Sequence, residues 1–163
     1  MIGRFFRTFR RSEPSILDTR PQDAAALAAV HALTFRHGWS ELEFERLLSD
    51  RAVIGHVARA PGGGGSVVGF VLSRLAADEA EILVIAVAPA GRSRGLAGRL
   101  LRRHLQRLAT LGVSRVFLEV DEGNDTALRL YARAGFQEIG RRAGYYRRPE
   151  GEAAALMLRR DLA

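Results

Sequence analysis

The 163-residue chain contains neither cysteine nor a long hydrophobic run, and each absence excludes a class of protein. Without cysteine, no disulfide and no thiolate metal site can form, which agrees with a reducing compartment. No run of about eighteen apolar residues is present, so we expect no membrane-spanning helix. The arginine-rich start MIGRFFRTFRR is also unlike the apolar region of a secretory signal. We therefore expect a cytoplasmic protein with no membrane partner.

Lysine is also absent, so all 25 basic residues are arginine, and the formal net charge is +7. Clustered basic residues attract the phosphates of nucleic acids. Here, however, arginine accompanies abundant alanine and glycine, which indicates a general compositional bias of the source genome rather than a nucleic-acid-binding surface. We therefore expect no direct nucleic-acid partner. Residues 1–15 form a basic N-terminal extension in which arginine alternates with phenylalanine. A packed or frayed extension is favoured there over a membrane or ribosome contact.

The remaining 16–163 are predicted to form a single domain, because this length suits one core of ordinary size. The 47% hydrophobic and 26% charged fractions are typical of globular proteins. The four histidines lack the spacing of metal ligands, so we expect surface or core roles for them and no metal site. We expect a monomer or a weak dimer.

Hydrophobic periodicity predicts a mixed α/β fold. The run EILVIAVA at 81–88 is typical of a central strand buried on both faces, and the helix that follows it leads into another strand, which predicts a right-handed parallel crossover. The PGGGG segment predicts a hairpin loop, because no helix start follows it to bind phosphate. Strands are expected over 16–20, 52–60, 66–76, 81–88, 114–120, 136–146 and 153–160. Helices are expected over 21–33, 40–49, 94–111 and 124–134.

The turn after 81–88 is the most informative segment, because it joins a buried strand to a helix start and contains glycine. Unpaired amides of a first helical turn and the helix dipole favour an anion there, and glycine lets the backbone approach it. We predict that a pyrophosphate binds to Arg92, Ser93, Arg94, Gly95, Leu96, Ala97 and Gly98. The same turn reads GRSRG, which matches the Gly-x-Ser-x-Gly elbow of hydrolases. The only later histidine, His104, lies on the same helix and cannot reach Ser93, so we reject a hydrolase.

The pattern Arg92-x-x-Gly95-x-Ala97 after Val87-Ala88-Pro89 resembles the acetyl-CoA signature of the GNAT family of N-acetyltransferases. The likeness runs from about Leu17 to Leu162 and includes LEV at 118–120, Asn124, LYARAGF at 130–136 and YY at 145–146. It implies the GNAT fold, which is a mixed, mostly antiparallel sheet with a central splayed parallel strand pair and about four helices. It also implies acetyl-CoA as the co-substrate and no metal.

Within that family the chain most resembles bacterial enzymes that acetylate the N-terminal alanine of a ribosomal protein. The GWS segment at 38–40 is part of this likeness, whereas the N-terminal extension departs from it. The resemblance implies that backbone atoms of Ile85, Ala86 and Val87 bind the pantetheine arm and acetyl group. It also implies a cofactor contact for Asn124, although helix capping explains that residue equally well.

Acetyl transfer requires a neutral amine, a polarised thioester carbonyl and a proton for the departing thiolate. We expect Glu119 to take the amine's proton, through water, although a structural charge on a strand edge remains open. We expect Tyr131 to protonate or hydrogen-bond the sulfur of coenzyme A, with simple core packing as the alternative. An amide near Val87 is the candidate donor to the developing oxyanion.

The pKa values of amines indicate which class of acceptor the enzyme would use. An α-amine with a pKa near ~8 is about 10% neutral at pH 7, whereas a lysine near ~10.4 is below ~0.1%, so a lone glutamate suits an α-amine better. Trp39, Tyr145 and Tyr146 are expected to line the acceptor groove, with ordinary packing as the alternative.

The leading hypothesis is direct acetyl transfer to a protein N-terminal α-amine, with the alanine of a ribosomal protein as the expected acceptor. One alternative is a GNAT enzyme that acetylates a small-molecule amine or antibiotic. The other is a non-catalytic acyl-CoA-binding or ribosome-associating module.

Overall fold

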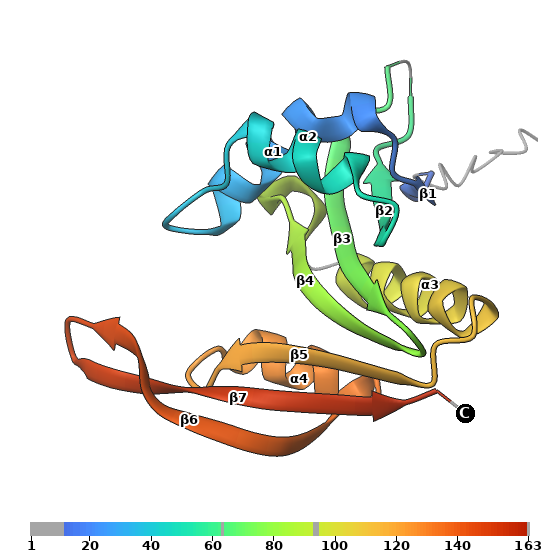
Figure 1. Ribbon diagram of the computed structural model, residues 1–163. Coiled ribbons are helices and arrows are strands. Elements are labelled where there is room, and N and C mark those ends of the chain that lie inside the picture. The colour runs from blue at the N-terminus through green and yellow to red at the C-terminus, as the bar shows by residue number, and fades with distance from the viewer. Residues whose placement is uncertain (1–11, 63, 93–94, 163) are drawn as a thin grey trace, which may run out of the picture.

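The computed structural model describes residues 12–62, 64–92 and 95–162, which form one sheet flanked by helices on both faces (Figure 1). The strands are β1 (Ser15–Asp18), β2 (Val53–Arg59), β3 (Val67–Ala76), β4 (Glu79–Val87), β5 (Arg115–Asp121), β6 (Gln137–Arg148) and β7 (Gly151–Asp161). The helices are α1 (Ala24–Thr34), α2 (Glu41–Ser49), α3 (Leu96–Thr110) and α4 (Asp125–Arg133), with short 3-10 turns η1 (Pro21–Asp23) and η2 (Pro89–Gly91).

The strand order is β1-β2-β3-β4-β5-β7-β6, and every neighbouring pair is antiparallel except β4 and β5. This confirms the mixed, mostly antiparallel sheet with one central parallel pair. Helix α3 connects the two parallel strands, as the sequence predicts for a crossover. The first strand begins at Ser15 and ends at Asp18, two residues before its expected end. The chain turns there because the Arg20 amide donates to Oδ2 of Asp23 (2.7 Å) at the start of η1.

The parallel pairing of β4 and β5 is short. It comprises Glu79 with Arg115, Ala80 with Val116 and Glu81 with Phe117. Beyond these residues β4 continues along β3 and β5 continues along β7, so the two strands diverge, as Figure 1 shows between β4 and β5. We call Ile82–Val87 of β4 and Leu118–Asp121 of β5 the splayed segments. Their facing edges have no strand partner among the described residues, which confirms the expected splay.

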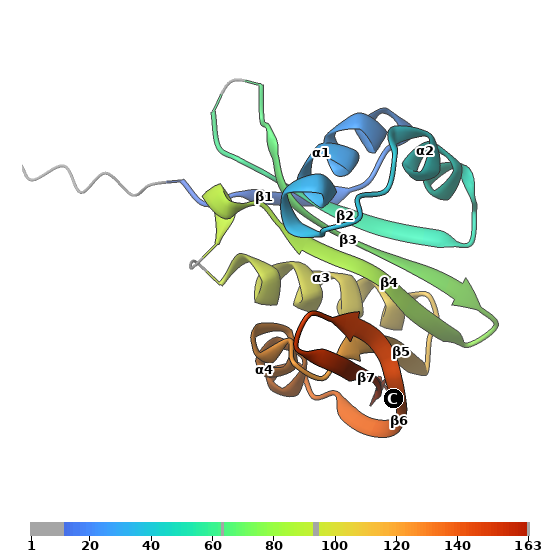
Figure 2. The ribbon, with the colours of Figure 1, turned by 90° about the vertical axis from the view of Figure 1, so that its left-hand side faces the viewer.

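Two apolar clusters hold the helices against the sheet. One lies on the α3 and α4 face and includes Leu100, Leu108, Val116 and Leu118. The other lies under α1 and α2 and is centred on Phe44, with Val57, Phe70, Val84 and others around it. Figure 2 shows α1 and α2 on one side of β1–β4 and α3 on the other. Burial of both clusters stabilises the sheet from its two faces.

Helix ends follow the local sequence. The expected capping box is confirmed, because the Glu43 amide donates to Oγ of Ser40 (3.3 Å) and the Glu43 carboxylate accepts from the Ser40 amide (2.6 Å). Hydrogen bonds from the backbone and then the side chain of Ser40 lower the pKa of Glu43. Helix α3 instead starts after Gly95, whose φ of 67° lies in the left-handed region that favours glycine.

Candidate active site

Glu119 lies on the splayed segment of β5, on the face opposite the α3 and α4 cluster. Val116, Leu118 and Val120 are buried in that cluster, whereas the Glu119 side chain is 30% exposed on the other face. The alternation read from the sequence is therefore confirmed. A carboxylate in this position keeps access to solvent while standing beside the point where β4 and β5 separate.

A cationic and aromatic group from β6 surrounds Glu119. Nη2 of Arg142 is 3.8 Å from Oε1 of Glu119, and the Arg142 guanidinium carbon lies 4.7 Å from the centre of the Tyr145 ring. The rings of Tyr145 and Tyr146 are perpendicular, with centroids 5.1 Å apart. Burial, then the charge of Glu119 and the neighbouring Tyr145, raise the pKa of Tyr146. Both predicted tyrosines are thus brought to the side of Glu119.

Sequence reasoning missed Arg142, and a strand irregularity explains why. Arg142 is in register with Ala155 and Tyr146 with Ala153, so three residues of β6 stand against one of β7. This bulge breaks the two-residue alternation by which neighbours on a strand face are recognised. No local sequence signal would have assigned Arg142 and Tyr146 to one carboxylate.

Tyr131 lies on α4 and packs in the core. It is 6% exposed, and its ring centroid is 5.7 Å from that of Phe136. Burial raises its pKa to about 12, so the phenol remains protonated at neutral pH. Its hydroxyl has no hydrogen-bond partner among the described residues, yet it is not one of the fully sealed polar atoms, so it keeps some contact with solvent. The residue therefore packs in the core and still offers a free donor.

The turn from β4 to α3 leaves helical amides without acceptors. The first backbone bond of α3 runs from the Arg99 amide to the Gly95 carbonyl (3.1 Å), and no described side chain caps the helix. The amides of Leu96, Ala97 and Gly98 precede that bond and have no intrahelical acceptor. A Cβ atom added at Gly98 would meet no other atom within 4 Å, so this surface is open.

Glycine and arginine shape the start of the same turn. A Cβ atom at Gly91 would lie 3.1 Å from both Leu96 Cδ2 and Val87 Cγ1, so only glycine fits without displacement. The Nε of the exposed Arg92 donates to the Val87 carbonyl (3.1 Å), which ties the turn to the end of β4. Ser93 and Arg94, two of the predicted phosphate-binding residues, lie outside the described residues.

The backbone of β4 at the predicted pantetheine site pairs only on its β3 side. Ile85, Ala86 and Val87 are in register with Val71, Phe70 and Gly69. No β5 residue pairs with these three positions among the described residues, so alternate backbone groups on that edge remain free, apart from the Val87 carbonyl that accepts from Arg92. Ala86 is buried under α1, whereas Ile85 and Val87 pack against the α3 cluster.

Asn124 caps α4. Its side-chain oxygen accepts a hydrogen bond from the Ala127 amide at 3.2 Å, and the residue is exposed. The capping interpretation offered by the sequence is therefore observed, and a cofactor contact is left as a prediction.

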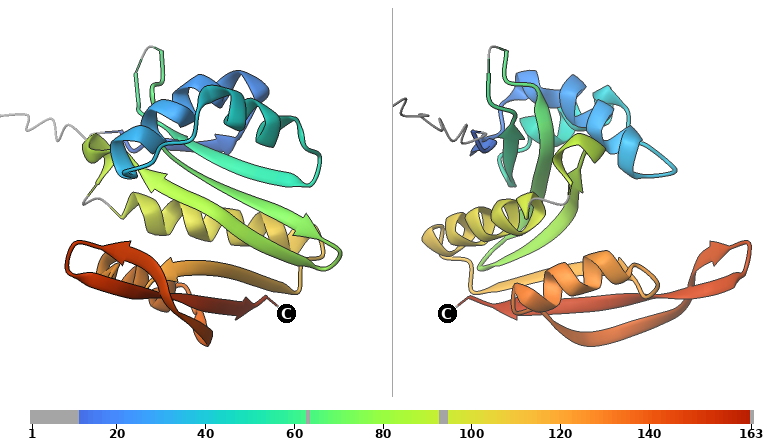
Figure 3. Two further views of the ribbon diagram at one scale, coloured as in Figure 1. Left: turned by 60° about the vertical axis from the view of Figure 1, so that its left-hand side comes forward. Right: turned by 180° about the vertical axis from the view of Figure 1, so that it is seen from behind.

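Trp39 belongs to an aromatic group in the connection between α1 and α2. Its amide donates to Nδ1 of His31 (3.1 Å), and its ring stacks on His31 with centroids 4.9 Å apart. Burial lowers the pKa of His31, partly offset by the charge of Glu43. This connection and the β6–β7 hairpin project from the same side of the molecule, on either side of the diverging strands (Figures 1 and 3). No contact among those described joins Trp39 to Tyr145 or Tyr146.

The described residues contain neither a membrane-spanning helix nor a cluster of metal ligands. None of their helices has both the length and the apolar character needed to cross a membrane. No group of three or more histidine, aspartate or glutamate side chains within them could hold a metal ion.

Comparison with known proteins relates the chain to acetyltransferases. Residues 24–136 match the acetyltransferase (GNAT) family. The ribosomal protein bS18-alanine N-acetyltransferase of Escherichia coli strain K12 is 30% identical over 133 residues, which cover 80% of this chain and 87% of that one. The N-alpha-acetyltransferase RimI of Mycobacterium tuberculosis is 44% identical over 102 residues, covering 60% and 61%. The bS18-alanine N-acetyltransferase of Haemophilus ducreyi is 35% identical over 94 residues, covering 56% and 65%. The chain thus spans just under two thirds of the latter two relatives.

Solved structures of acetyltransferases have a similar fold. The crystal structure of the ribosomal-protein-S18-alanine N-acetyltransferase from Escherichia coli superposes with a TM-score of 0.83 at 25% identity, over 92% of this chain and 94% of that one. Ard1 from Thermoplasma volcanium superposes with a TM-score of 0.80 at 23% identity, over 93% and 99%, and supports the fold alone.

Proposed function

This chain belongs to the acetyltransferase (GNAT) family, and we propose that it transfers the acetyl group of acetyl-CoA to the α-amine of a protein N-terminus. The observation that carries the proposal is the divergence of β4 and β5 beyond Glu81 and Phe117, with Glu119 on one splayed segment and free backbone groups on the other. The names of the bacterial relatives support the alanine of a ribosomal protein as the acceptor.

The α3 turn has the chemistry to hold the diphosphate of acetyl-CoA. Its uncapped amides at Leu96, Ala97 and Gly98 point out of a helix N-terminus, where the helix dipole favours negative charge. The open surface at Gly98 lets an anion approach these amides closely. Arg92 adds positive charge at the rim, and we assign Ser93, Arg94 and Gly95 to the same cradle. Asn124 would contact the cofactor from the start of α4.

The edge of β4 would position the reactive end of the cofactor. When bound, acetyl-CoA supplies an acetyl group activated as a thioester. Backbone groups at Ile85, Ala86 and Val87 lack a β5 partner and would hydrogen-bond the pantetheine arm in its place. An amide near Val87 would donate to the carbonyl oxygen, where negative charge develops during attack by the amine. Loss of such a donor typically costs about 10²-fold or more in rate.

Glu119 would act as the general base. As the amine nitrogen bonds to the acetyl carbon and the carbon–sulfur bond breaks, the surplus amine proton passes to the Glu119 carboxylate, through water. Arg142 stands 3.8 Å from that carboxylate, and both side chains remain partly exposed, so an incoming amine is not blocked by burial. Transfer is direct within a ternary complex, and no protein side chain carries the acetyl group.

Tyr131 would assist the departing sulfur mainly by donating a hydrogen bond. Its pKa of about 12 lies above that of a thiol near ~8.5, so complete proton transfer would cost about 5 kcal/mol. Donation from a phenol that stays protonated carries no such cost. The leaving thiolate then takes its proton from solvent.

The acceptor groove would lie between the α1–α2 connection, with Trp39, and the β6 strand, with Tyr145 and Tyr146. A peptide N-terminus fits this arrangement, because about 10% of its α-amine is already neutral at pH 7, so a single glutamate suffices as the base.

The decisive experiment measures acetyl transfer by mass spectrometry. The purified chain is incubated with acetyl-CoA and a peptide that begins with alanine, the same peptide with a blocked N-terminus but a free lysine, or spermidine. We expect acetylation of the first substrate only. Transfer to spermidine but to neither peptide would reject the proposed acceptor, and absence of transfer to all three would reject the proposed activity. Glu119→Gln should abolish most turnover, whereas Glu138→Gln, which removes a carboxylate elsewhere on the sheet, should not.

A further inference from the structure

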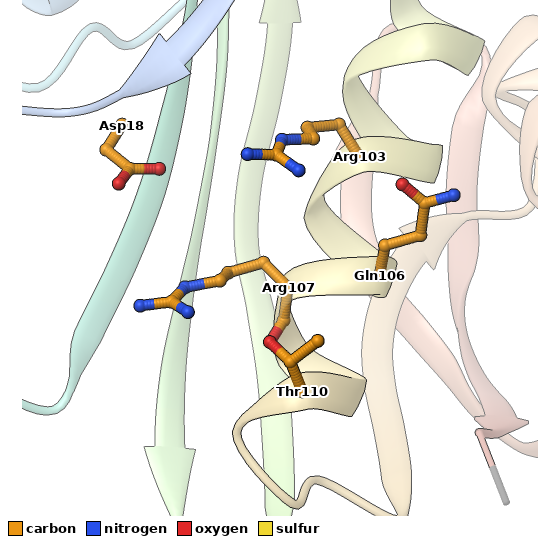
Figure 4. Close-up of a pocket in the computed structure, with 5 residues that line it drawn as sticks. All are labelled: Asp18, Arg103, Gln106, Arg107 and Thr110. Atoms are coloured by element: carbon orange, nitrogen blue, oxygen red, sulfur yellow. The ribbon is translucent and has the colours of Figure 1, made fainter.

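A second polar site lies against α3, away from its N-terminal turn. A depression of about 310 Å³ is lined by Asp18 of β1 and by Arg103, Gln106, Arg107 and Thr110 of α3. Arg103 and Arg107 are four residues apart and so lie on one face of the helix. Figure 4 shows both guanidinium groups directed toward Asp18. Nothing in the proposed acetyl transfer uses these residues.

The two arginines have no partner of their own. Among the described residues, neither guanidinium group makes a hydrogen bond or an ion pair. Asp18 contributes one negative charge against their two positive charges, so the depression has one positive charge in excess. Gln106 adds a neutral amide that can donate a hydrogen bond. Two neighbouring guanidinium groups without partners among the described residues are the donors that suit a tetrahedral oxyanion.

A pair of buried histidines, His56 and His104, lies next to Asp18. Nδ1 of His56 is 2.8 Å from Nδ1 of His104, whose Nε2 is 2.6 Å from Oγ of Ser73. All three residues are fully buried. Because the two Nδ1 atoms must share one hydrogen, the arrangement with Ser73 donating to His104 and His104 donating to His56 leaves the remaining proton on Nε2 of His56. The reverse arrangement would aim a lone pair of that nitrogen at the Asp18 carboxylate, which is unfavourable.

Nε2 of His56 is the one sealed polar atom without a hydrogen bond among the described residues. It lies 3.3 Å from Oδ1 of Asp18, within ion-pair distance but too poorly aligned for a hydrogen bond. Burial lowers the pKa of His56 most, the charge of Asp18 raises it, and Arg103 and Arg107 lower it further. An anion bound between the two arginines would offset their charges and so favour a proton on His56.

We propose that the Arg103–Arg107 depression is a phosphoryl-binding site, in which a phosphate group bridges the two guanidinium groups beside Asp18 and His56. Its dianionic charge exceeds the single positive charge of the empty depression by one. Proton uptake by His56 supplies the missing positive charge, so phosphate binding and protonation of His56 favour one another. The ligand is therefore either free phosphate or a small phosphate monoester.

Nuclear magnetic resonance of the histidine ring nitrogens tests the site directly. The full chain, saturated with acetyl-CoA to occupy the α3 turn, is titrated with sulfate, inorganic phosphate or glycerol 3-phosphate at constant ionic strength, with chloride as the balance. Sulfate is included because its charge does not change between pH 5 and pH 8, so any pH dependence belongs to the protein. We expect saturable shifts at His56 Nε2, with tighter sulfate binding at pH 6 than at pH 8.

Charge variants localise the site. Arg103→Gln with Arg107→Gln should weaken binding by about tenfold or more, and each single change should weaken it less. Arg102→Gln removes an exposed charge of the same helix outside the depression and should leave binding unchanged. Equal affinity in the double variant, or the same shifts when chloride alone is titrated, would overturn the proposal. Tighter binding of glycerol 3-phosphate than of phosphate would identify a phosphate ester as the ligand, and the opposite order free phosphate.

Discussion

Replacing Tyr131 by phenylalanine removes one oxygen and little else from the protein. The ring lies in the core beside Phe136, and phenylalanine retains that packing. The hydroxyl has no hydrogen-bond partner among the described residues, so its removal should change the free energy of unfolding by less than about 1 kcal/mol. Tyr131→Phe therefore separates a role in catalysis from a role in packing.

The expected loss of activity follows from the bond that the hydroxyl would donate. A hydrogen bond to a charged group contributes about 1.5–3 kcal/mol, which corresponds to a fall in kcat of about 10- to 150-fold. Because the pKa of Tyr131 is about 12, wild-type kcat should show no loss from its ionisation below pH 10. The KM for acetyl-CoA should change little if the bond forms only as the sulfur gains charge.

Steady-state release of free coenzyme A, measured from pH 6 to pH 10, tests this expectation beside a thermal unfolding curve for each variant. Ser49→Ala is the control, because it removes an exposed hydroxyl at the end of α2, outside the proposed site, and should leave kcat within about twofold. A Tyr131→Phe enzyme with wild-type kcat would refute the role of the phenol. A variant that loses stability in proportion to activity would show that the residue acts only through packing.

Three further predictions concern stability and cofactor binding. Burial, and then the neighbouring His56, lower the pKa of His104 to about 3, against ~6.5 in an unfolded chain. Between these two pH values the unfolded state therefore binds more protons than the folded state, so the free energy of unfolding decreases as the pH falls. Urea titrations should show a loss of about 3 kcal/mol from pH 7 to pH 4, which His104→Gln should reduce and His37→Gln, at an exposed histidine, should not. Gly98→Glu should raise the melting temperature, because an added Cβ meets no atom within 4 Å and a carboxylate is favourable at a helix start. The same variant should raise the KM for acetyl-CoA about tenfold, because its carboxylate repels the diphosphate. An unchanged KM would contradict the proposed diphosphate site. Ser40→Ala should cost about 1 kcal/mol in the free energy of unfolding by removing the α2 cap, and a smaller loss in chemical denaturation would show that the cap is dispensable.

Local signals were sufficient for most of the fold. Ser40 and Glu43 defined the start of α2, and Asn124 defined the start of α4, because each cap is made within one helical turn. The apolar run at 81–88 identified β4 because a strand covered on both faces contains few polar side chains. The boundary of β1 was less accurate, since the chain leaves the strand for a hydrogen bond between Arg20 and Asp23 that no periodicity reveals.

The candidate site was only partly accessible from the sequence. The glycine-containing turn that opens α3 and the position of Glu119 on the face opposite the buried residues of β5 follow from local pattern, and the structure has both. The roles of these residues in binding and catalysis stay predictions. Arg142 was missed because its neighbours are set by a bulge in β6, and the Asp18–His56–His104 group was missed because its members come from three separate elements.

The sequence by itself determined which segments are helices and strands, where the parallel crossover lies, and which helix start is left free for an anion. These properties depend on side-chain periodicity and on hydrogen bonds spanning a few residues. Only the tertiary structure decided how far β4 and β5 pair before they diverge, and which side chains meet between β5 and β6 and among β1, β2 and α3. Those contacts join residues far apart in the chain, and their geometry follows from how the two apolar clusters pack the helices against a twisted sheet.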